Sequence, residues 1–392
     1  MEKLWKYKKI GEVCIVERGA SPRPIDKYIT DNESGINWIK IGDTSDSMYI
    51  TETAQKIIVE GMKKSRYVKP GDFLLSNSMS FGRPYILKID GCIHDGWLVL
   101  RDENALFDKR FLYYYLSSKT TYKKLKSMAV GGVVNNLNSE MVRNVIVPVP
   151  DKEEQSEIAD LFDKIKKILD DRKQELEQLD TLVKSRFVEM FGDIITGKYN
   201  YKIRKLGDVA FIGSSHRVFT TEFVESGIPF YRGTEIGELA NGIEPSEPYY
   251  ISEEHYNKLT KDNTKPRIGD LLMPSICNKG QIWMVDTDRP FYYKDGRVLC
   301  ISPNRDIFNS KYLEYFMRIK TLVEYPKLGS GSTFAEFKIF LLKDMDVLVP
   351  PRNVQNQFAD FVVSVDKSKS KIQKSLEETQ LLFDSLMQKY FG

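Results

Sequence analysis

An internal duplication constrains this chain of 392 residues more than any other feature of its sequence. At an offset of 200 residues, 13 of the 46 positions in 147–192 are identical to those in 347–392, without a gap. Average composition predicts about 3 identities by chance. Each copy begins with a short β-like run ending in proline, continues without glycine or proline, and closes on Phe-Gly. The period is too long for a solenoid, so we interpret it as one globular domain followed by one long helix, present twice.

The stretch after each proline run has the heptad spacing of a coiled coil. Alternating steps of three and four residues connect nine positions from 162 to 190, and seven of the nine are apolar in each copy. Such a seam predicts that each helix pairs with another helix, although each could instead pack only on its own domain. The residues predicted to pair the helices are Phe162, Ile165, Leu169, Leu176, Leu179, Val183, Val362, Val365, Ile372, Leu376, Phe383 and Leu386.

The segment before each helix carries the signals of short mixed strands with one or two helices. In the first copy, 35–43 and 96–101 have strand patterns, and 108–128 has helical spacing with Asp108 as a possible cap. The second copy repeats these signals in the same order, with different loop side chains. The predicted fold class is α+β, with two similar mixed α/β domains and two long helices. The predicted boundaries are 1–146 and 193–346 for the domains, and 147–192 and 347–392 for the helices.

Composition limits the function only weakly. The formal net charge is +3 with 29% charged residues, which neither requires nor excludes a nucleic-acid partner. The four cysteines are far apart and form no CxxC pair, as expected for reduced thiols rather than for a disulfide frame or a zinc site. The start of the chain lacks the apolar core of a signal peptide, and no apolar run approaches the roughly 18 residues of a membrane span. We therefore expect a cytoplasmic protein without a membrane segment.

The sequence contains no recognisable catalytic set. An Asn-Pro-Pro-Tyr-like motif, a glycine-rich cofactor loop and a P-loop are all missing. Glu336 and Lys338 fit the acidic-x-Lys spacing of metal-dependent nucleases, but this spacing is common by chance. His94 beside Asp95 could form a dyad or contact a base, although a turn histidine satisfied by its neighbour is the simpler interpretation. We predict neither a catalytic residue nor a metal site in this chain.

Three pairs of ordered motifs resemble those of a known family. They are IGEV and LGDV at the domain starts, GDFLLSNSMSFGRP and GDLLMPSICNKGQ in mid-domain, and VIVPVPDKEEQSEIADLF and VLVPPRNVQNQFADFV at the helix starts. Over its whole length, the chain resembles the specificity (S) subunit of type I restriction–modification enzymes. The family more often has Glu-Gln after the prolines. Glu154 and Gln155 keep this pair, whereas the second copy has Val354 before Gln355.

The resemblance implies a non-catalytic DNA-recognition subunit without a cofactor of its own. Two target recognition domains would each read one half of a bipartite site in double-stranded DNA, and the helices would pair antiparallel as a spacer. Because the loops of the two copies differ, the whole target should be asymmetric. Two methyltransferase (M) subunits carrying S-adenosylmethionine would dock on the chain. Restriction (R) subunits would add functions that depend on ATP and Mg²⁺.

Polar residues in glycine-containing loops, at equivalent places in both copies, are the candidates for DNA contact. The bland alternative is that Ser, Asn and Gly simply form turns there. The candidates are Ser21, Arg23, Ser76, Asn77, Ser78, Arg83, Asn135 and Asn136 in the first domain, and Ser215, His216, Arg217, Arg232, Ser275, Asn278, Lys279, Gln281, Ser330 and Ser332 in the second.

Two other functions are compatible with these patterns. A coiled-coil adaptor would bind other proteins through its duplicated domains, without preference for any DNA sequence. A stand-alone nuclease would cleave DNA in the presence of a metal ion and without partner subunits.

Overall fold

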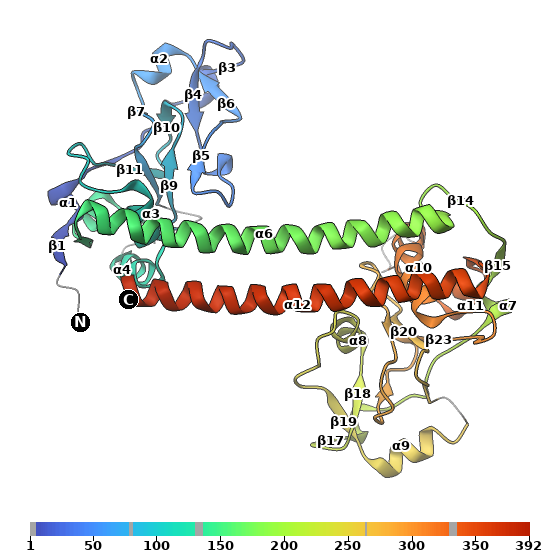
Figure 1. Ribbon diagram of the computed structural model, residues 1–392. Coiled ribbons are helices and arrows are strands. Elements are labelled where there is room, and N and C mark those ends of the chain that lie inside the picture. The colour runs from blue at the N-terminus through green and yellow to red at the C-terminus, as the bar shows by residue number, and fades with distance from the viewer. Residues whose placement is uncertain (1–4, 78–80, 130–135, 263–264, 329–334) are drawn as a thin grey trace. The chain divides into compact units, whose positions relative to one another are not determined.

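The computed structural model describes residues 5–77, 81–129, 136–262, 265–328 and 335–392 (Figure 1). The chain forms two compact units: unit 1 comprises Met1–Gln174 and Gln373–Gly392, and unit 2 comprises Glu175–Ile372. The boundary falls inside both long helices, α6 (Lys152–Phe191) and α12 (Arg352–Phe391). Each unit therefore contains one α+β domain and one end of each long helix, which confirms the predicted fold class.

Unit 1 is built from a two-stranded sheet, β1-β12, and two five-stranded sheets with the orders β2-β11-β8-β9-β5 and β3-β6-β4-β10-β7. The strands are β1 (Lys6–Lys9), β2 (Ile15–Arg18), β3 (Ile29–Thr30), β4 (Ile36–Ile39), β5 (Tyr49–Ile50), β6 (Gln55–Ile57), β7 (Arg66–Val68), β8 (Phe73–Ser76), β9 (Pro84–Leu87), β10 (Gly91–Ile93), β11 (Trp97–Arg101) and β12 (Ile146–Val149). The short helices and turns are α1 (Ile10–Val13), η1 (Ile25–Lys27), η2 (Ile41–Asp43), α2 (Val59–Met62), α3 (Lys109–Ser117), α4 (Lys119–Ala129) and α5 (Ser139–Arg143).

The sheet that contains β11 is buried on both faces. Leu98 and Leu100 face the core shared with α3 and the long helices. Trp97 and Val99, which point the other way, face a second core shared with strands β4, β7 and β10. Successive side chains of a strand alternate between its faces, so a strand with no polar position, such as 97–100, must lie between two apolar layers. This sheet is therefore the central layer of the domain.

Unit 2 repeats this plan with the sheets β15-β24, β16-β23-β20-β21 and β17-β19-β18-β22, and adds the hairpin β13-β14. The strands are β13 (Gly192–Asp193), β14 (Lys198–Tyr199), β15 (Ile203–Lys205), β16 (Ala210–Gly213), β17 (Phe223–Val224), β18 (Ile228–Tyr231), β19 (Tyr249–Ile251), β20 (Leu271–Pro274), β21 (Trp283–Met284), β22 (Tyr292–Tyr293), β23 (Val298–Pro303) and β24 (Asp346–Leu348). The short helices and turns are α7 (Leu206–Val209), η3 (Thr220–Glu222), α8 (Gly233–Leu239), α9 (Glu253–Leu259), α10 (Ser310–Glu324), η4 (Tyr325–Leu328) and α11 (Ile339–Lys343).

The central sheet of unit 2 is also buried on both faces. Leu299 and Ile301 of β23 face the core shared with α10 and the long helices. Val298 and Cys300 face the other core, with Tyr231 and Tyr293. The strand that follows the first short helix pairs antiparallel with this central strand in both units, β2 with β11 and β16 with β23. The two domains therefore share one scaffold.

The long helices pair antiparallel. In unit 1, Phe162 near the start of α6 lies 5.4 Å from Phe383 and 5.7 Å from Phe391 near the end of α12, between ring centroids. In unit 2, Phe187 near the end of α6 lies 5.3 Å from Phe358 near the start of α12. The side chains of all twelve residues predicted to pair the helices are buried or half-buried.

The same seams also pack on the domains. The ring of Phe162 lies 4.9 Å from that of Tyr114 on α3, and the ring of Phe358 lies 5.1 Å from that of Tyr315 on α10. The two interpretations of the heptad pattern are therefore both true in part, because each helix contacts the other helix and a domain.

A buried glutamine joins each domain to the start of its long helix. Gln155 Oε1 accepts the backbone N–H of Asp108 at 2.8 Å, and its Nε2 donates to the carbonyl of Pro150 at 2.9 Å. Gln355 does the same with Asn309 at 2.9 Å and Pro350 at 2.8 Å. Neither side chain is exposed to solvent. Buried polar groups require such partners, which explains why Gln is common to both copies while the residue before it differs.

The helical segment predicted at 108–128 forms as two helices. Asp108 caps α3 by accepting the backbone N–H groups of Arg110 at 2.8 Å and Phe111 at 3.4 Å, as predicted. Ser118 then adopts an extended conformation and ends α3. Its Oγ accepts the N–H of Thr121 at 3.1 Å and so caps α4. The spacing of apolar residues does not reveal this break, because both helices bury side chains in the same core.

Candidate nucleic-acid interface

In unit 1, three chain segments meet at the turn that precedes β11. Ser21 Oγ, after β2, donates to Asp95 Oδ1 at 2.9 Å. Asn77 Nδ2, after β8, donates to the Asp95 carbonyl at 2.8 Å, and Arg18 Nε donates to the same carbonyl at 3.1 Å. Arg23 Nη2 lies 3.3 Å from Asp95 Oδ2. The candidates Ser21, Arg23 and Asn77, far apart in the sequence, are thus brought together around one aspartate.

Backbone hydrogen bonds extend this turn to the last loop of the domain. The Asn77 N–H donates to the Gly96 carbonyl at 3.0 Å, and the Leu137 N–H donates to the Asn77 carbonyl at 3.1 Å. Asn136, next to Leu137, is half-buried. The candidates Ser78 and Asn135 lie outside the described residues.

Arg23 is the candidate of this turn that solvent reaches most freely, with 81% of its side chain exposed. Burial alone would raise the pKa of Asp95. The hydrogen bonds from Ser21 and from its own backbone, together with the electrostatic influence of His94 and the positive charge of Arg23, lower this pKa overall. The carboxylate is therefore charged at neutral pH. An exposed pair of this kind contributes only about 0–1 kcal/mol, so Arg23 can exchange partners at little cost.

Arg83 has a second carboxylate partner. Its Nη2 donates to the Ser45 carbonyl and to Asp46 Oδ1, both at 3.2 Å. Its Cζ lies 5.3 Å from the centroid of the Tyr85 ring. Ser76 Oγ accepts the Arg83 backbone N–H at 3.0 Å. Ser76 and Asn77 are buried, and their side chains bond to the Arg83 backbone and to the Asp95 carbonyl. A DNA contact from either one stays a prediction.

Unit 2 builds the equivalent turn before β23. Arg217 Nε lies 3.2 Å from Asp295 Oδ2, and Ser215 Oγ donates to the Tyr293 carbonyl at 2.6 Å. The Ser275 N–H donates to the Arg297 carbonyl at 2.8 Å, and the Phe337 N–H donates to the Ser275 carbonyl at 2.7 Å. The same three segments and the end of the same last loop therefore meet again. Ser275 is buried, as Asn77 is.

Two further candidates of unit 2 lie beside carboxylates. His216 Nε2 lies 2.5 Å from Asp262 Oδ2. Arg232 Nη2 lies 2.5 Å from Glu235 Oε1 on α8, and its Cζ lies 4.6 Å from the centroid of the Tyr249 ring. Burial acts to raise the pKa of Glu235, but the hydrogen bonds from Arg232 and from two backbone N–H groups lower it overall.

The loop after β20 supplies the remaining candidates. Asn278 and Lys279 are exposed, and the Lys279 N–H donates to Gln281 Oε1 at 3.0 Å. Arg318 of α10 fixes the end of this loop by donating from Nη2 to the Ile282 carbonyl at 2.9 Å. Asn278 and Lys279 are thus presented to solvent from a loop anchored on a helix. Ser330 and Ser332 lie outside the described residues.

The groups considered for catalysis have structural partners. Glu336 is hydrogen-bonded to Lys338 and lies 2.9 Å from Arg297 Nη1, and Lys338 contributes most to lowering its pKa. His94 Nδ1 accepts the Gly96 N–H at 2.6 Å, which favours its role in the turn. Within the described residues, no three His, Cys, Asp or Glu side chains are grouped so that they could hold a metal ion.

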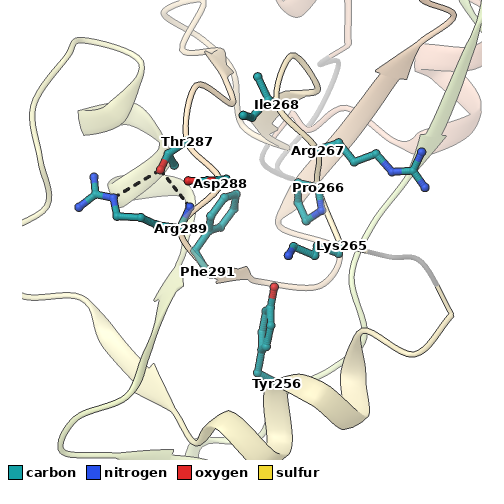
Figure 2. A pocket seen from close by; sticks show the side chains of 9 residues that line it. All are labelled: Tyr256, Lys265, Pro266, Arg267, Ile268, Thr287, Asp288, Arg289 and Phe291. Carbon is teal, nitrogen blue, oxygen red and sulfur yellow. Dashed lines mark hydrogen bonds between the residues drawn. The ribbon is translucent and has the colours of Figure 1, made fainter.

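A small cavity of about 130 Å³ lies in unit 2 between α9 and the segments 265–268 and 287–291 (Figure 2). The hydroxyl of Tyr256 faces it, and within the described residues this buried oxygen has no hydrogen-bond partner. Arg289 points away from the cavity and donates to Thr287 Oγ1. None of the candidates for DNA contact lines this cavity.

Sequence reasoning identified the arginines but not the acidic residues that hold them. Asp95 and Asp295 come from the same turn at an offset of 200 residues, each followed by glycine. This repeated Asp-Gly pair was the available signal. No repeated motif marks Asp46 or Glu235, because the segments around η2 in unit 1 and α8 in unit 2 differ.

Two equivalent polar faces, around the turns of Asp95 and Asp295, lie on a duplicated scaffold with paired helices. This arrangement defines a protein with two recognition modules. The sequence family described as type I restriction modification DNA specificity domain matches residues 2–179. The chain is 22% identical to the type I restriction enzyme MjaIX specificity subunit of Methanocaldococcus jannaschii, over 99% of this chain and 92% of that protein. It is also 22% identical to the MjaVIII specificity subunit of the same organism, over 95% and 90%.

Solved structures share this fold. The crystal structure of the type I restriction–modification S subunit from M. genitalium matches with a TM-score of 0.55 at 15% identity, over 99% of this chain and 96% of that one. A chain from a study of complex assembly and conformational transition in a type I restriction–modification system matches with a TM-score of 0.63 at 18% identity, over 99% and 97%.

Residues 2–179 belong to the family of type I restriction–modification DNA specificity domains, and over nearly its whole length the chain is similar to specificity (S) subunits of such systems. It is the DNA specificity subunit of such a system and is itself non-catalytic. In the described part of the chain, no helix combines the length and apolar character that crossing a membrane would need.

Proposed function

We propose that each unit reads one half of a bipartite, asymmetric DNA target. The observation that carries this proposal is the equivalence of the two turns: Asp95 and Asp295 hold Arg23 and Arg217 in one frame, while the surrounding side chains differ. Arginine is well suited to bidentate recognition of guanine in the major groove. One scaffold that carries two different sets of such side chains is suited to two different half-sites.

The paired helices are proposed to set the spacing between the half-sites. Each is one continuous helix of 40 residues, and at about 1.5 Å per residue such a helix is roughly 60 Å long. This length exceeds one turn of B-DNA, about 34 Å. The buried glutamines support this role, because a spacer is useful only when each reading domain is fixed firmly to it.

The proposed partners are the other subunits of a type I system. Two methyltransferase subunits would bring S-adenosylmethionine, and restriction subunits would bring the activities that need ATP and Mg²⁺. The described residues of this chain offer groups for reading DNA and for pairing helices, so the methyl transfer and the cleavage are assigned to these partners. The complex would act on DNA in the cytoplasm.

Selection of DNA from a random library tests this proposal. The chain is co-expressed with its methyltransferase subunits, and the complex should select two fixed half-sites separated by a gap of constant length. Selection without any sequence preference would contradict the proposal and favour a protein-binding adaptor. Metal-dependent cleavage by the chain alone would favour a nuclease.

Substitutions of two exposed candidates then assign the half-sites. Arg83→Gln should relax selection in one half-site and Asn278→Ala in the other, each by about 1–3 kcal/mol per contacted base pair. Lys164→Gln, which removes an exposed charge from α6, is the control and should leave both half-sites unchanged. Equal weakening on every sequence would assign Arg83 or Asn278 to phosphate contact.

A further inference from the structure

The arginines of both candidate faces share one property, since each is paired with a carboxylate. For Arg23, Arg83 and Arg217 it comes from another segment, and for Arg232 it comes from the first turn of the adjoining helix α8. The distances between nitrogen and oxygen are 2.5–3.3 Å for the pairs Arg23–Asp95, Arg83–Asp46, Arg217–Asp295 and Arg232–Glu235. A surface designed only to attract phosphate would leave its cations without acidic neighbours, because phosphate attraction scales with the positive charge offered. This pairing therefore has a cost for DNA affinity, and its recurrence needs a physical reason.

The pairs made by Asp95 and Asp295 are equivalent between the two units. Both aspartates precede the glycine of the turn before the central strand, and both arginines stand two residues after a serine. This serine bonds to Asp95 itself in unit 1 and to the carbonyl of Tyr293, two residues before Asp295, in unit 2. Backbone bonds fix each turn independently of the carboxylate. They run from Asn77 to Gly96 at 3.0 Å and from Ser275 to the carbonyl of Arg297 at 2.8 Å. The aspartate side chains are therefore more than turn formers.

We propose that Asp95 and Asp295 are specificity-determining positioning residues, which orient Arg23 and Arg217 for bases and penalise binding through phosphates alone. This inference rests on the proposed function. Asp295 holds Arg217 through Nε, and a guanidinium has five N–H donors in a planar fork, so donors remain for a guanine edge while the pair stays intact. On a cognate half-site the aspartate therefore supports the contact.

On DNA without the target sequence, the aspartate opposes binding instead. When the remaining donors of Arg23 or Arg217 meet a phosphate, the paired carboxylate stays charged beside the DNA backbone. Repulsion between this carboxylate and the phosphates weakens such a contact, whereas the edge of a guanine carries no net charge and is not repelled in this way. Because this repulsion acts only on phosphate binding, the two aspartates widen the gap between specific and non-specific affinity.

The test compares cognate and non-cognate duplexes. The complex of this chain with its methyltransferase subunits is titrated with a duplex that carries the target sequence of the complex, and with a scrambled duplex of the same length. The affinity for each duplex is measured over a series of salt concentrations. Asp95→Asn or Asp295→Asn should tighten binding to the scrambled duplex by roughly 3- to 10-fold without tightening binding to the target. A merely structural role cannot produce this gain, since a damaged fold weakens binding to all DNA.

Matched controls remove the same charge elsewhere. Asp31→Asn in unit 1 and Asp286→Asn in unit 2 replace exposed aspartates and should change either affinity by less than about twofold. An equal gain in these controls would overturn the inference, because the effect would then come from net charge. Unchanged binding of the scrambled duplex by both Asp95→Asn and Asp295→Asn would also overturn it.

Arg23→Gln separates this inference from the proposed function. If this variant leaves target and scrambled binding unchanged, the assignment of Arg23 to DNA contact fails, and the inference about Asp95 fails with it. If Arg23→Gln weakens target binding while Asp95→Asn keeps the ratio of the two affinities unchanged, only the inference about the aspartate fails.

Discussion

The two units agree most closely at the junction between domain and helix, and least at the polar faces. At the junction, Gln155 and Gln355 make equivalent hydrogen bonds, 2.8 and 2.9 Å to the capping residue of α3 or α10. At the polar faces only the frame is shared. Asn77 holds the turn in unit 1 through its side chain and backbone, whereas Ser275 bonds to the turn in unit 2 through its backbone N–H. The hydrogen bonds that join each domain to its helix are thus the same in both units, whereas the side chains of the polar faces differ.

The paired helices show a similar contrast in their aromatic residues. Unit 1 buries Phe162 from α6 against Phe383 from α12, whereas unit 2 buries Phe187 from α6 against Phe358 from α12. At an offset of 200 residues, Phe162 corresponds to Val362. The aromatic contact of unit 2 therefore lies outside the predicted heptad positions, although the heptad residues Val183 and Val362 are also buried there.

Lengthening both helices should have the largest effect on function. Seven residues inserted after Glu175 and seven after Ser375 would keep the heptad register and add about 10 Å to each helix. If the helices set the spacing, the complex should select a gap about 3 base pairs longer, keep both half-sites, and stop modifying the original target. Selection from a random library measures the gap. Changed half-sites with an unchanged gap would refute the spacer role.

Removing either buried glutamine should have the next largest effect. Gln155→Ala removes the acceptor of the Asp108 N–H and leaves a cavity. Together these changes should lower the free energy of unfolding by about 2–4 kcal/mol. Gln355→Ala should cost a similar amount, because its contacts are equivalent. Hydrogen exchange at Asp108 and Asn309 reports each junction separately. Glu157→Ala and Gln357→Ala, at exposed positions on the same helices, are the controls. Unchanged protection in either glutamine variant would contradict this equivalence.

The cysteines should give the smallest effect and no difference between the units. All four are free and buried. Burial raises the pKa of Cys14 and Cys300 to about 12, and that of Cys92 and Cys277 to about 11. A thiol with a raised pKa forms little thiolate at pH 8, and the thiolate is the reactive form. Mass spectrometry after brief iodoacetamide treatment should show no alkylation of the native protein and four alkylated cysteines after unfolding. Rapid labelling of one native cysteine would show that its core opens.

Repetition and local pattern made much of the fold predictable from the sequence. The apolar run 97–100, the Asp108 cap and the heptad positions all specify structure through neighbours within a few residues. The break at Ser118 was not predictable, because both helices have the spacing expected of one. The sequence also gave no indication that Gln155 bonds to Asp108, 47 residues away.

The candidate site was predictable only in part. Arg23 and Arg217 stand out because polar loops recur at equivalent places, and the repeated Asp-Gly pair could have pointed to their partners. The pairing of Arg83 with Asp46, 37 residues earlier, depends on how η2 and β9 pack in three dimensions. Which bases the loops read is decided by the same three-dimensional arrangement, and the DNA contacts of the candidates therefore stay predictions.

The most direct test of two separate readers is methylome sequencing of host strains that carry Arg23→Gln or Arg217→Gln. Separate readers predict that the first variant relaxes or abolishes recognition in one half of the methylated sequence, and the second variant in the other half. Relaxation should appear as new methylated sequences that differ from the original target in that half alone. If both variants altered the same half, or if each altered both halves, the claim that each unit reads its own half-site would be wrong.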